Sequence, residues 1–335
     1  MNSANSVINV IGAGGIGCVV SWALLSTGRS IRLFERNSAK RYLIQNNGIR
    51  LAGWGTQWPW VGQLDNDLGQ LKGPTIVCVK TYDNQSVISY LSAGFPLLVI
   101  QNGIDAVWQE TPERITGIAS FISEPIVKTG GVQLTRPGDL HIGAENHVHG
   151  WTDTNYWHSN LKVPLFRIGI KTKAHRDIIP YRNMKFVYNC AISPLASSLG
   201  VDNGELLSNA KIRDLFLALL RENIEIFKIR KFPLGKIGPF DSDIVVSILS
   251  NKFLRNVLSK CFELSLRGTY CSMSKDFVSG KTEFDQYIGK LIEIAGEFDC
   301  PLNKLLWKEI VELMNKGKGP DLKLVDRILC KINNP

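Results

Sequence analysis

The sequence predicts an α/β protein, with a doubly wound parallel sheet in its N-terminal half and an all-helical C-terminal half. Three observations support this. Val7–Ile11 is a short apolar strand that runs directly into a glycine-rich turn and a helix. Short apolar runs then alternate with helical patterns as far as about Lys171, and the remaining chain carries apolar residues at helical spacing. Because 335 residues exceed one ordinary core, we expect two domains, residues 1–172 and 173–335.

Composition indicates an ordinary globular protein, with 44% hydrophobic and 21% charged residues. The net charge of +9 is spread over scattered Lys and Arg, which suits anionic small molecules better than nucleic acid. The N-terminus has no basic region, and the longest apolar run, about Ile16 to Leu25, is too short to span a bilayer. The seven cysteines show no C-x-x-C spacing. We therefore expect a cytoplasmic protein with reduced, buried thiols and no membrane partner.

The first element is a strand that leads into Gly12-x-Gly14-x-x-Gly17 and then a helix that stops at Gly28. Gly12 permits the sharp turn, Gly14 lets a pyrophosphate approach the bare backbone, and Gly17 lets the helix lie close to the strand. The helix N-terminus supplies N–H groups and a positive dipole end for the phosphates. This pattern predicts a Rossmann-type turn whose cofactor-binding residues are Gly12, Ala13, Gly14, Gly15, Ile16 and Gly17.

The end of the second strand, Ile31–Phe34, bears on which cofactor is used. Glu35 is a carboxylate of the kind that accepts hydrogen bonds from the adenosine ribose, which favours NAD. Arg36 follows it and can pair with a 2′-phosphate, which favours NADP, or it is a solvated loop charge. The sequence modestly favours NADP(H) as the cofactor, and NAD(H) is the alternative.

Two later strands place polar side chains at their carboxyl ends, where parallel sheets bind ligands. Thr75–Val79 leads to Lys80, and Leu97–Ile100 leads to Asn102, so both are candidate cofactor contacts. Residues 84–91 are predicted to be helical. An aromatic loop, Gly53 to Trp60, either pins itself to the domain or stacks on a ligand.

From residue 116 to 144 the pattern changes to short strands separated by turn-forming clusters, which predicts an antiparallel extension of the sheet. This polar region contains four histidines without Cys or carboxylates at metal spacing, so we expect loop histidines and no metal site. They are His141, His147, His149 and His158.

In the second half, Lys185, Asn189 and Ser193 are spaced i, i+4, i+8, so one helical face would present a cation, an amide and a hydroxyl. Apolar neighbours would desolvate the lysine and lower its pKa, which suits a proton donor. The alternative is a surface lysine whose ammonium group reaches water. Spacing alone does not decide between the two.

Several motifs together resemble the ketopantoate reductase (2-dehydropantoate 2-reductase) family, in the right order and over almost the whole chain. They are the N-terminal GAGGIG, Val79-Lys80, Gln101-Asn102-Gly103, Lys185–Leu195, Asn203-Gly204-Glu205-Leu206, Cys271-Ser272-Met273-x-x-Asp276 and Thr282-Glu283-Phe284-Asp285.

The resemblance implies NADPH-dependent reduction of 2-dehydropantoate to pantoate in the pantothenate pathway. It implies that Lys185 is the general acid and that Glu283 lies near both this lysine and the nicotinamide ribose. The implied substrate contacts are Asn189, Asn203 and Ser272, with Ser193 on the same helix; the implied cofactor contacts are Arg36, Lys80, Asn102 and Glu283. Members of the family are often dimeric, so a homodimer is also implied.

The sequence departs from the family pattern at three places. Ser193 stands where asparagine is usual, Glu35 stands where a small neutral residue is usual, and the segment from Asp276 to Glu283 is one residue short. One alternative is therefore an NAD(P)-dependent 2-hydroxy acid dehydrogenase acting on another branched or aromatic 2-keto acid. Another, from a different class, is a catalytically silent NAD(P)-binding sensor.

Overall fold

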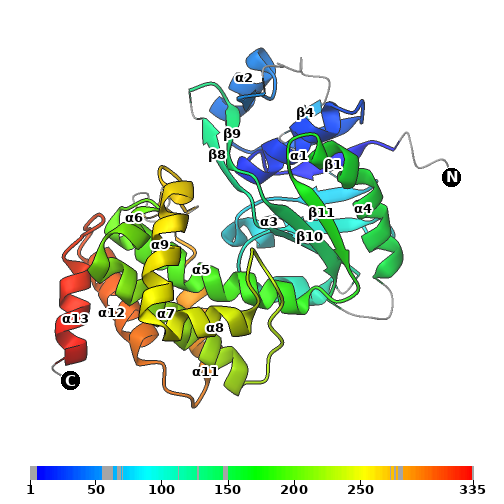
Figure 1. The fold of residues 1–335 in the computed structure, drawn as a ribbon. Coiled ribbons are helices and arrows are strands. Elements are labelled where there is room, and N and C mark those ends of the chain that lie inside the picture. Colours follow the sequence, from blue (N-terminus) through cyan, green and yellow to red (C-terminus); the bar gives the residue numbers. More distant parts are fainter. Residues whose placement is uncertain are drawn as a thin grey trace. The chain divides into compact units, whose positions relative to one another are not determined.

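The computed structural model divides into two compact units, Met1–Ile178 and Ile179–Pro335 (Figure 1). The domain boundary expected after residue 172 falls inside a strand, Lys171–His175, which belongs to the first unit. The structure describes residues 6–54, 63–65, 69, 71–111, 113–126, 128–145, 150–271, 273, 274, 277 and 282–333.

The first unit is built on an eight-stranded sheet in the order β11-β10-β7-β6-β5-β1-β2-β4. The pairs from β7 through β4 are parallel, β10 is antiparallel to β7, and β11 is parallel to β10. The strands are β1 (Ile8–Ile11), β2 (Ile31–Phe34), β4 (Gln63–Asp65), β5 (Thr75–Val77), β6 (Leu97–Ile100), β7 (Ile115–Ala119), β10 (Asp139–Ala144) and β11 (Lys171–His175).

Apolar side chains are buried on both faces of this sheet. Successive side chains of a strand point to opposite faces, so neighbouring residues enter different cores. Val10 belongs to one core and Ile11 to the other, and Leu98 and Val99 divide in the same way. The expected doubly wound sheet is therefore confirmed. Its helices are α1 (Gly15–Leu25), α2 (Ser38–Asn47), α3 (Asn84–Ile88) and α4 (Trp151–Phe166).

A second sheet corrects one expectation. β8 (Ile122–Ile126) and β9 (Gly131–Arg136) are antiparallel, but they join β3 (Leu51–Ala52) in a separate three-stranded sheet; of the strands in this region, β7 and β10 belong to the main sheet, where they pair antiparallel to each other. The small sheet packs on α1, and Val132 enters the same core as that helix. The hairpin thus buries its apolar side chains against a helix rather than along a sheet edge.

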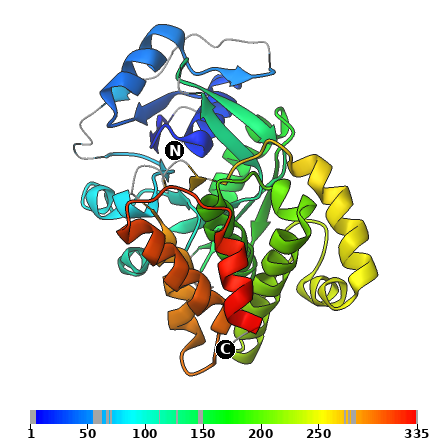
Figure 2. The same cartoon turned by 90° about the vertical axis from the view of Figure 1, so that its left-hand side faces the viewer.

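All the regular secondary structure in the described residues of the second unit is helical. Its centre is α7, whose predicted apolar stripe, including Leu215, Leu219 and Phe227, is buried. Helices α5, α12 and α13 all pack on α7, and Figures 1 and 2 show α13 beside α12. The helices are α5 (Ile179–Leu199), α6 (Glu205–Ser208), α7 (Ala210–Ile229), α8 (Ser242–Ser250), α9 (Lys252–Leu266), α11 (Lys290–Ala295), α12 (Pro301–Asn315) and α13 (Leu324–Asn333), with a π-helical turn η4 (Asp285–Gly289).

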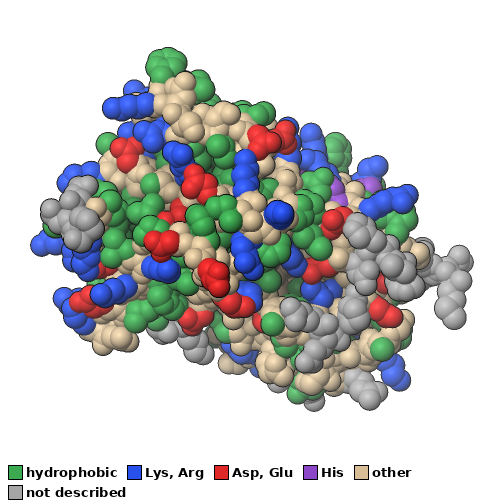
Figure 3. Space-filling view, turned by 90° about the horizontal axis from the view of Figure 1, so that it is seen from below, with side chains coloured by type: hydrophobic (Ala, Val, Ile, Leu, Met, Phe, Trp, Pro, Cys, Tyr) green, Lys and Arg blue, Asp and Glu red, His purple; other side chains and the backbone are tan. Residues whose placement is uncertain are grey.

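The surface mixes both signs of charge. On the face in Figure 3, Lys and Arg side chains lie among acidic and apolar ones instead of forming one patch. Within the part of the chain that the structure describes, no helix is both long and apolar enough to cross a membrane. Three cysteines are buried, as expected, but Cys261 and Cys330 are exposed.

The histidine expectation is wrong for two residues that the structure describes. His141 lies buried in β10 and His158 lies in α4, so neither is a loop residue; His147 and His149 fall outside the described residues. His141 Nδ1 is 2.9 Å from Nε2 of His175 on the neighbouring β11, and the rings are stacked. Among the residues described, no three His, Cys, Asp or Glu side chains form a group that could hold a metal ion.

Candidate active site

The glycine-rich turn between β1 and α1 has the steric design that the sequence predicts. Gly12 has a φ of +94°, a conformation that favours glycine. A Cβ on Gly17 would lie 1.9 Å from the carbonyl oxygen of Gly12, so only glycine allows α1 to approach the strand this closely. Gly15 has a different constraint, since a Cβ there would lie 2.6 Å from the carbonyl oxygen of Ser123 in β8.

Gly14 is the exception in this turn, because a Cβ there would meet no atom within 4 Å. It is the N-cap of α1, offers no side-chain cap, and no acidic residue follows in the first turn. The N–H groups of a helix N-terminus beside open space suit a phosphate anion. The residues present therefore fit the pyrophosphate of a dinucleotide.

Glu35 ties the end of β2 to this turn. Its Oε2 accepts a hydrogen bond from the N–H of Ala13 at 3.2 Å, and its Oε1 accepts one from the N–H of Asn37 at 2.9 Å. Lys40 Nζ lies 3.7 Å from Oε2. A carboxylate has about four acceptor positions, so Glu35 can still accept hydrogen bonds from ribose hydroxyl groups.

Arg36 contacts an acidic side chain. Its Nη1 lies 2.7 Å from Oδ1 of Asp83, and the arginine side chain is 66% exposed. Asp83 belongs to the 3₁₀ turn η2 (Thr81–Asp83), which follows Lys80. Arg41 Nη1 donates to the carbonyl oxygens of Glu35 and Arg36, at 2.8 Å each, and so holds the backbone of this corner.

Lys80 and Asn102 both lie half-buried beyond the carboxyl ends of β5 and β6. Gln101, between β6 and Asn102, joins the segment after β6 to the segment after β5. Its Nε2 donates to the carbonyl oxygen of Val79 at 2.7 Å and to Oδ1 of Asn84 at 2.6 Å. Gln101 Oε1 accepts from the indole N–H of the tryptophan at position 108, at 3.0 Å. These bonds fix the segments that carry both candidate cofactor contacts.

In the second unit, Lys185, Asn189 and Ser193 lie on α5 as the spacing predicts. Asn189 and Ser193 are buried, and Lys185 is half-buried. Burial also raises the pKa of Tyr188 to about 12, so this phenol beside the helical face stays protonated at neutral pH.

A buried polar network holds α5 against α7 and α12. Asn223 Nδ2 donates to the carbonyl oxygen of Val187 at 3.1 Å, and Asn223 Oδ1 accepts from Asn303 Nδ2 at 2.8 Å. Glu222 accepts the N–H groups of Leu302 and Asn303 at the start of α12. Because every one of these bonds is buried or partly buried, the network fixes how α5 is rotated within the unit.

Glu283 is 3% exposed and lies two residues before the start of the π-helical turn η4. In that turn the ring of Tyr287 stacks on Phe186, with centroids 6.4 Å apart, directly beside Lys185 in the sequence. π-Helical turns occur often at functional sites. The stack brings the segment that carries Glu283 against the lysine-bearing helix.

Asn203 is held at the corner that follows α5. Its backbone N–H donates to the carbonyl oxygen of Thr269 at 2.8 Å, and its Nδ2 donates to Oγ1 of Thr269 at 3.0 Å. Its Oδ1 is buried and has no hydrogen-bond partner among the described residues. A buried polar atom of this kind calls for an explanation, and a bound ligand supplies one.

The chain after Thr269 returns to α5. Cys271 Sγ lies 3.6 Å from the carbonyl oxygen of Ser193 and 3.4 Å from Oγ of Ser197. The structure thus brings Ser193, Asn203 and the 269–271 segment together. Ser272, the next predicted contact, lies outside the described residues, and so do Trp58 and Trp60 of the aromatic loop.

Several residues of this arrangement were not identified from the sequence. Gln101 belongs to the motif Gln101-Asn102-Gly103 but has no role predicted from the sequence, and Asn223 and Asp83 belong to no motif. Their partners are distant in sequence or on another element, so only the folded structure reveals them. The one available signal was Gln101 itself, a long amide placed at the carboxyl end of a strand.

Comparison with known proteins assigns the chain to a family. Residues 8–147 match the family described as Ketopantoate reductase PanE/ApbA, and residues 177–313 match its C-terminal model. The 2-dehydropantoate 2-reductase of Pyrococcus horikoshii is 25% identical over 327 residues, which cover 93% of this chain and 99% of the relative.

Two solved structures share the fold at 16% sequence identity, each covering 93% of this chain and 99% of the other. One is D-mandelate dehydrogenase in a ternary complex with NADH and anilino(oxo)acetate, with a TM-score of 0.74. The other is a dimeric ketopantoate reductase from Staphylococcus aureus, with a TM-score of 0.65. Because the two family matches together span most of both units, the chain belongs to the ketopantoate reductase family of oxidoreductases.

Proposed function

We propose that this protein reduces 2-dehydropantoate to pantoate with NADPH. The observation that carries the proposal is the face of α5, where half-buried Lys185 shares one side of the helix with buried Asn189 and Ser193. Asn203 adds a buried acceptor oxygen without a described partner at the corner beyond this helix. A cation, an amide and a hydroxyl on one face suit a keto acid, which carries a carbonyl and a carboxylate.

The roles follow from the chemistry of each group. A bound nicotinamide cofactor supplies the hydride in such a reduction. Lys185 holds a proton on Nζ and donates it to the oxygen that becomes the hydroxyl, a contribution of about 10²–10⁴ in rate. Asn189, Ser193 and Ser272 bind and orient the keto acid, and Glu283 keeps the lysine in position.

On the nucleotide side, the N–H groups at the start of α1 bind the pyrophosphate beside Gly14. Lys80 and Asn102, on segments fixed by Gln101, contact the cofactor from the carboxyl ends of β5 and β6. Arg36 is 66% exposed at the end of β2, where it can turn from Asp83 to a 2′-phosphate.

A second candidate is an NADH-dependent reductase of another branched or aromatic 2-keto acid. Glu35 favours it, because its carboxylate is held beside the glycine-rich turn by the N–H of Ala13. A carboxylate there accepts ribose hydroxyls and repels a 2′-phosphate. The ion pair between Arg36 and Asp83 works in the same direction, and the mandelate dehydrogenase with this fold binds NADH.

The deciding experiment measures oxidation of NADPH and of NADH with 2-dehydropantoate, phenylglyoxylate and a small set of branched 2-keto acids. A kcat/KM for NADPH and 2-dehydropantoate that exceeds every other pair supports the proposal. A preference for NADH with an aromatic or branched keto acid establishes the second candidate instead. Binding of either cofactor without turnover of any keto acid rejects both.

We also propose that the protein is a homodimer, as the reductase from Staphylococcus aureus is described to be. Light scattering coupled to size-exclusion chromatography tests this directly. A mass near that of one 37.3 kDa chain at assay concentration would reject the dimer.

A further inference from the structure

The chain continues beyond the family match, which ends at residue 313. We call residues 318–333, which include α13, the C-terminal strap. Helix α13 packs on α12 and α7, and it buries Leu324, Val325 and Ile328 to 3% exposure or less. The strap is therefore docked by apolar contacts on one side of the helical unit.

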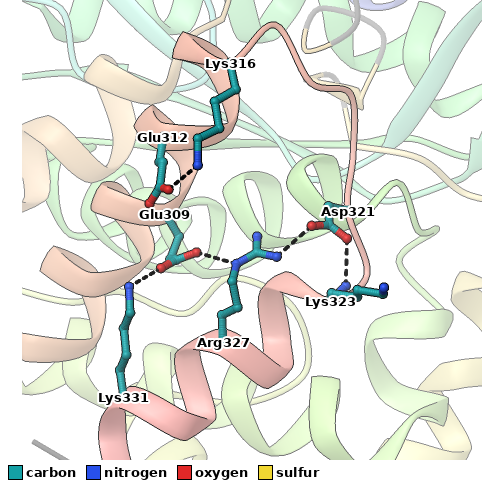
Figure 4. Close-up of polar contacts among 7 residues, drawn as sticks. All are labelled: Glu309, Glu312, Lys316, Asp321, Lys323, Arg327 and Lys331. Carbon is teal, nitrogen blue, oxygen red and sulfur yellow. Dashed lines mark hydrogen bonds and ion pairs between the residues drawn. The ribbon is translucent and has the colours of Figure 1, made fainter.

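Ion pairs and hydrogen bonds between charged side chains also hold the strap on the helical unit. The carboxylate of Glu309 on α12 is 2% exposed; it accepts a hydrogen bond from Arg327 Nε at 2.8 Å and one from Lys331 Nζ at 2.5 Å. Arg327 also donates through Nη1 to Oδ2 of Asp321, at 2.7 Å. Figure 4 shows Arg327 between the two carboxylates, with Lys331 on the far side of Glu309. Arg327 thus joins α13 to α12 and to the start of the strap.

The start of the strap contacts the end of α5. The backbone N–H of Asp321 donates to the carbonyl oxygen of Ser198 at 2.8 Å. The last four carbonyls of a helix lack partners inside it, so this bond caps α5 from another part of the chain. Gly200 has a φ of +71°, and a Cβ there would lie 2.8 Å from Cβ of Pro320. The strap therefore packs directly against the turn that leads to Asn203.

We propose that the C-terminal strap is a positioning element for keto acid binding, because it fixes the end of α5 and the turn that leads to Asn203. Arg327 is the positioning residue that fastens it. The kinetic part of this inference rests on the proposed reductase function, whereas its structural part, the ordering of residues 199–203, does not.

The test compares two variants. Arg327→Met with Lys331→Met removes both cations from Glu309 and keeps the apolar stems. Lys211→Met is the matched control, because it breaks only an exposed pair between Lys211 of α7 and Asp326 of α13. We expect the double variant to exchange the amides of residues 199–203 about tenfold faster or more, and the control to exchange them as the wild type does.

In steady-state kinetics, the double variant should raise KM for the keto acid about 5- to 20-fold, with kcat and the cofactor KM changed less than about 2-fold. A rescue variant shows whether the attachment of the strap matters or the charges themselves. Adding Glu309→Leu to the double variant replaces the ionic contact with an apolar one. It should restore both slow exchange and the wild-type KM.

Two results would overturn the inference. One is faster exchange in α13 while residues 199–203 exchange as in the wild type. The other is loosened exchange at 199–203 with an unchanged KM for the keto acid. If no keto acid is turned over even by the wild type, the proposed function fails, and the exchange experiment still decides whether the strap orders the end of α5.

Discussion

At the scale of single residues, a substitution of Lys185 should slow the chemical step and leave cofactor binding almost unchanged. Lys185→Met keeps the length of the side chain and removes the proton that the reduction needs. We expect kcat to fall by about 10²-fold or more, while the cofactor KM changes little, because the glycine-rich turn is untouched. Lys171→Met, at an exposed position on β11, is the control and should keep full activity. A loss of under about tenfold would remove Lys185 from the role of general acid.

A second residue-scale prediction concerns cofactor choice at the end of β2. Asp83→Asn removes the negative partner of Arg36, so the guanidinium becomes available to a 2′-phosphate. We expect KM for NADPH to fall about 3- to 10-fold while KM for NADH stays the same. The control is Asp243→Asn, which breaks an exposed pair with Lys228. Equal changes for both cofactors would mean that Arg36 does not contact a 2′-phosphate.

Local elements could be predicted from the sequence where short apolar runs stand between turn residues. The strands Ile31–Phe34 and Leu97–Ile100 are confirmed with their predicted limits. The predicted helix from Asn84 is shorter, because it ends at Ile88 instead of Leu91. Nothing local indicated the π-helical turn η4, whose tyrosine stacks on a residue about a hundred positions earlier in the chain.

At the scale of one structural element, two glycines of the turn between β1 and α1 should respond differently to alanine: one substitution should lower stability and the other should weaken cofactor binding. Gly17→Ala places a Cβ against the carbonyl of Gly12, and overpacking of this kind costs about 1–3 kcal/mol or more of unfolding free energy. Gly14→Ala meets no atom, so stability should stay within about 0.5 kcal/mol, but the methyl group enters the space assigned to the pyrophosphate.

Denaturant unfolding and cofactor titration measure both effects. Gly14→Ala should weaken cofactor binding about tenfold or more without shifting the unfolding midpoint. Unaltered cofactor affinity in Gly14→Ala would place the pyrophosphate elsewhere. Unaltered stability in Gly17→Ala would contradict the close approach of α1 to β1.

At the scale of the whole molecule, the sequence predicted the class of each half but not the long-range pairings. The β8–β9 hairpin joins β3 because Val132 and Leu51 pair across about eighty residues, which no local pattern reveals. The same holds for the candidate site. The spacing of Lys185, Asn189 and Ser193 was visible in the sequence, whereas the bonds from Asn203 to Thr269 depend on tertiary folding.

The two units should also respond differently to acid. Burial lowers the pKa of His141 to about 4, with further lowering from His175 and Lys173 that outweighs the raising effect of Asp139. A histidine whose folded pKa is depressed stabilises the protein above its unfolded pKa, near 6.5. That stability, on the order of 3 kcal/mol, is lost as the pH falls from about 6.5 to 4, because the unfolded chain binds the proton first.

In the second unit, burial alone would raise the pKa of Glu309, but hydrogen bonds from Arg327 and Lys331 outweigh it and hold the pKa below its ordinary value of 4.5. The stability contributed by this carboxylate is therefore present above about pH 4.5 and is lost only as the pH falls through the lower folded value. Between about pH 6.5 and 4.5, we expect the first unit to lose stability while the strap stays fastened.

Hydrogen exchange followed peptide by peptide, at about pH 7 and about pH 5 and corrected for intrinsic rates, separates the two units. Peptides from β10 and β11 should lose protection at the lower pH, while peptides from α12 and α13 should keep it. His141→Gln should reduce the loss in the first unit, because the ring with the more strongly depressed pKa is gone, while His175, whose pKa burial also lowers, remains. His158→Gln, at a half-buried ring on α4, should leave it in place. Parallel loss of protection in both units, or a loss as large in His141→Gln as in the wild type, would show that the buried His141 does not control the acid response of this molecule.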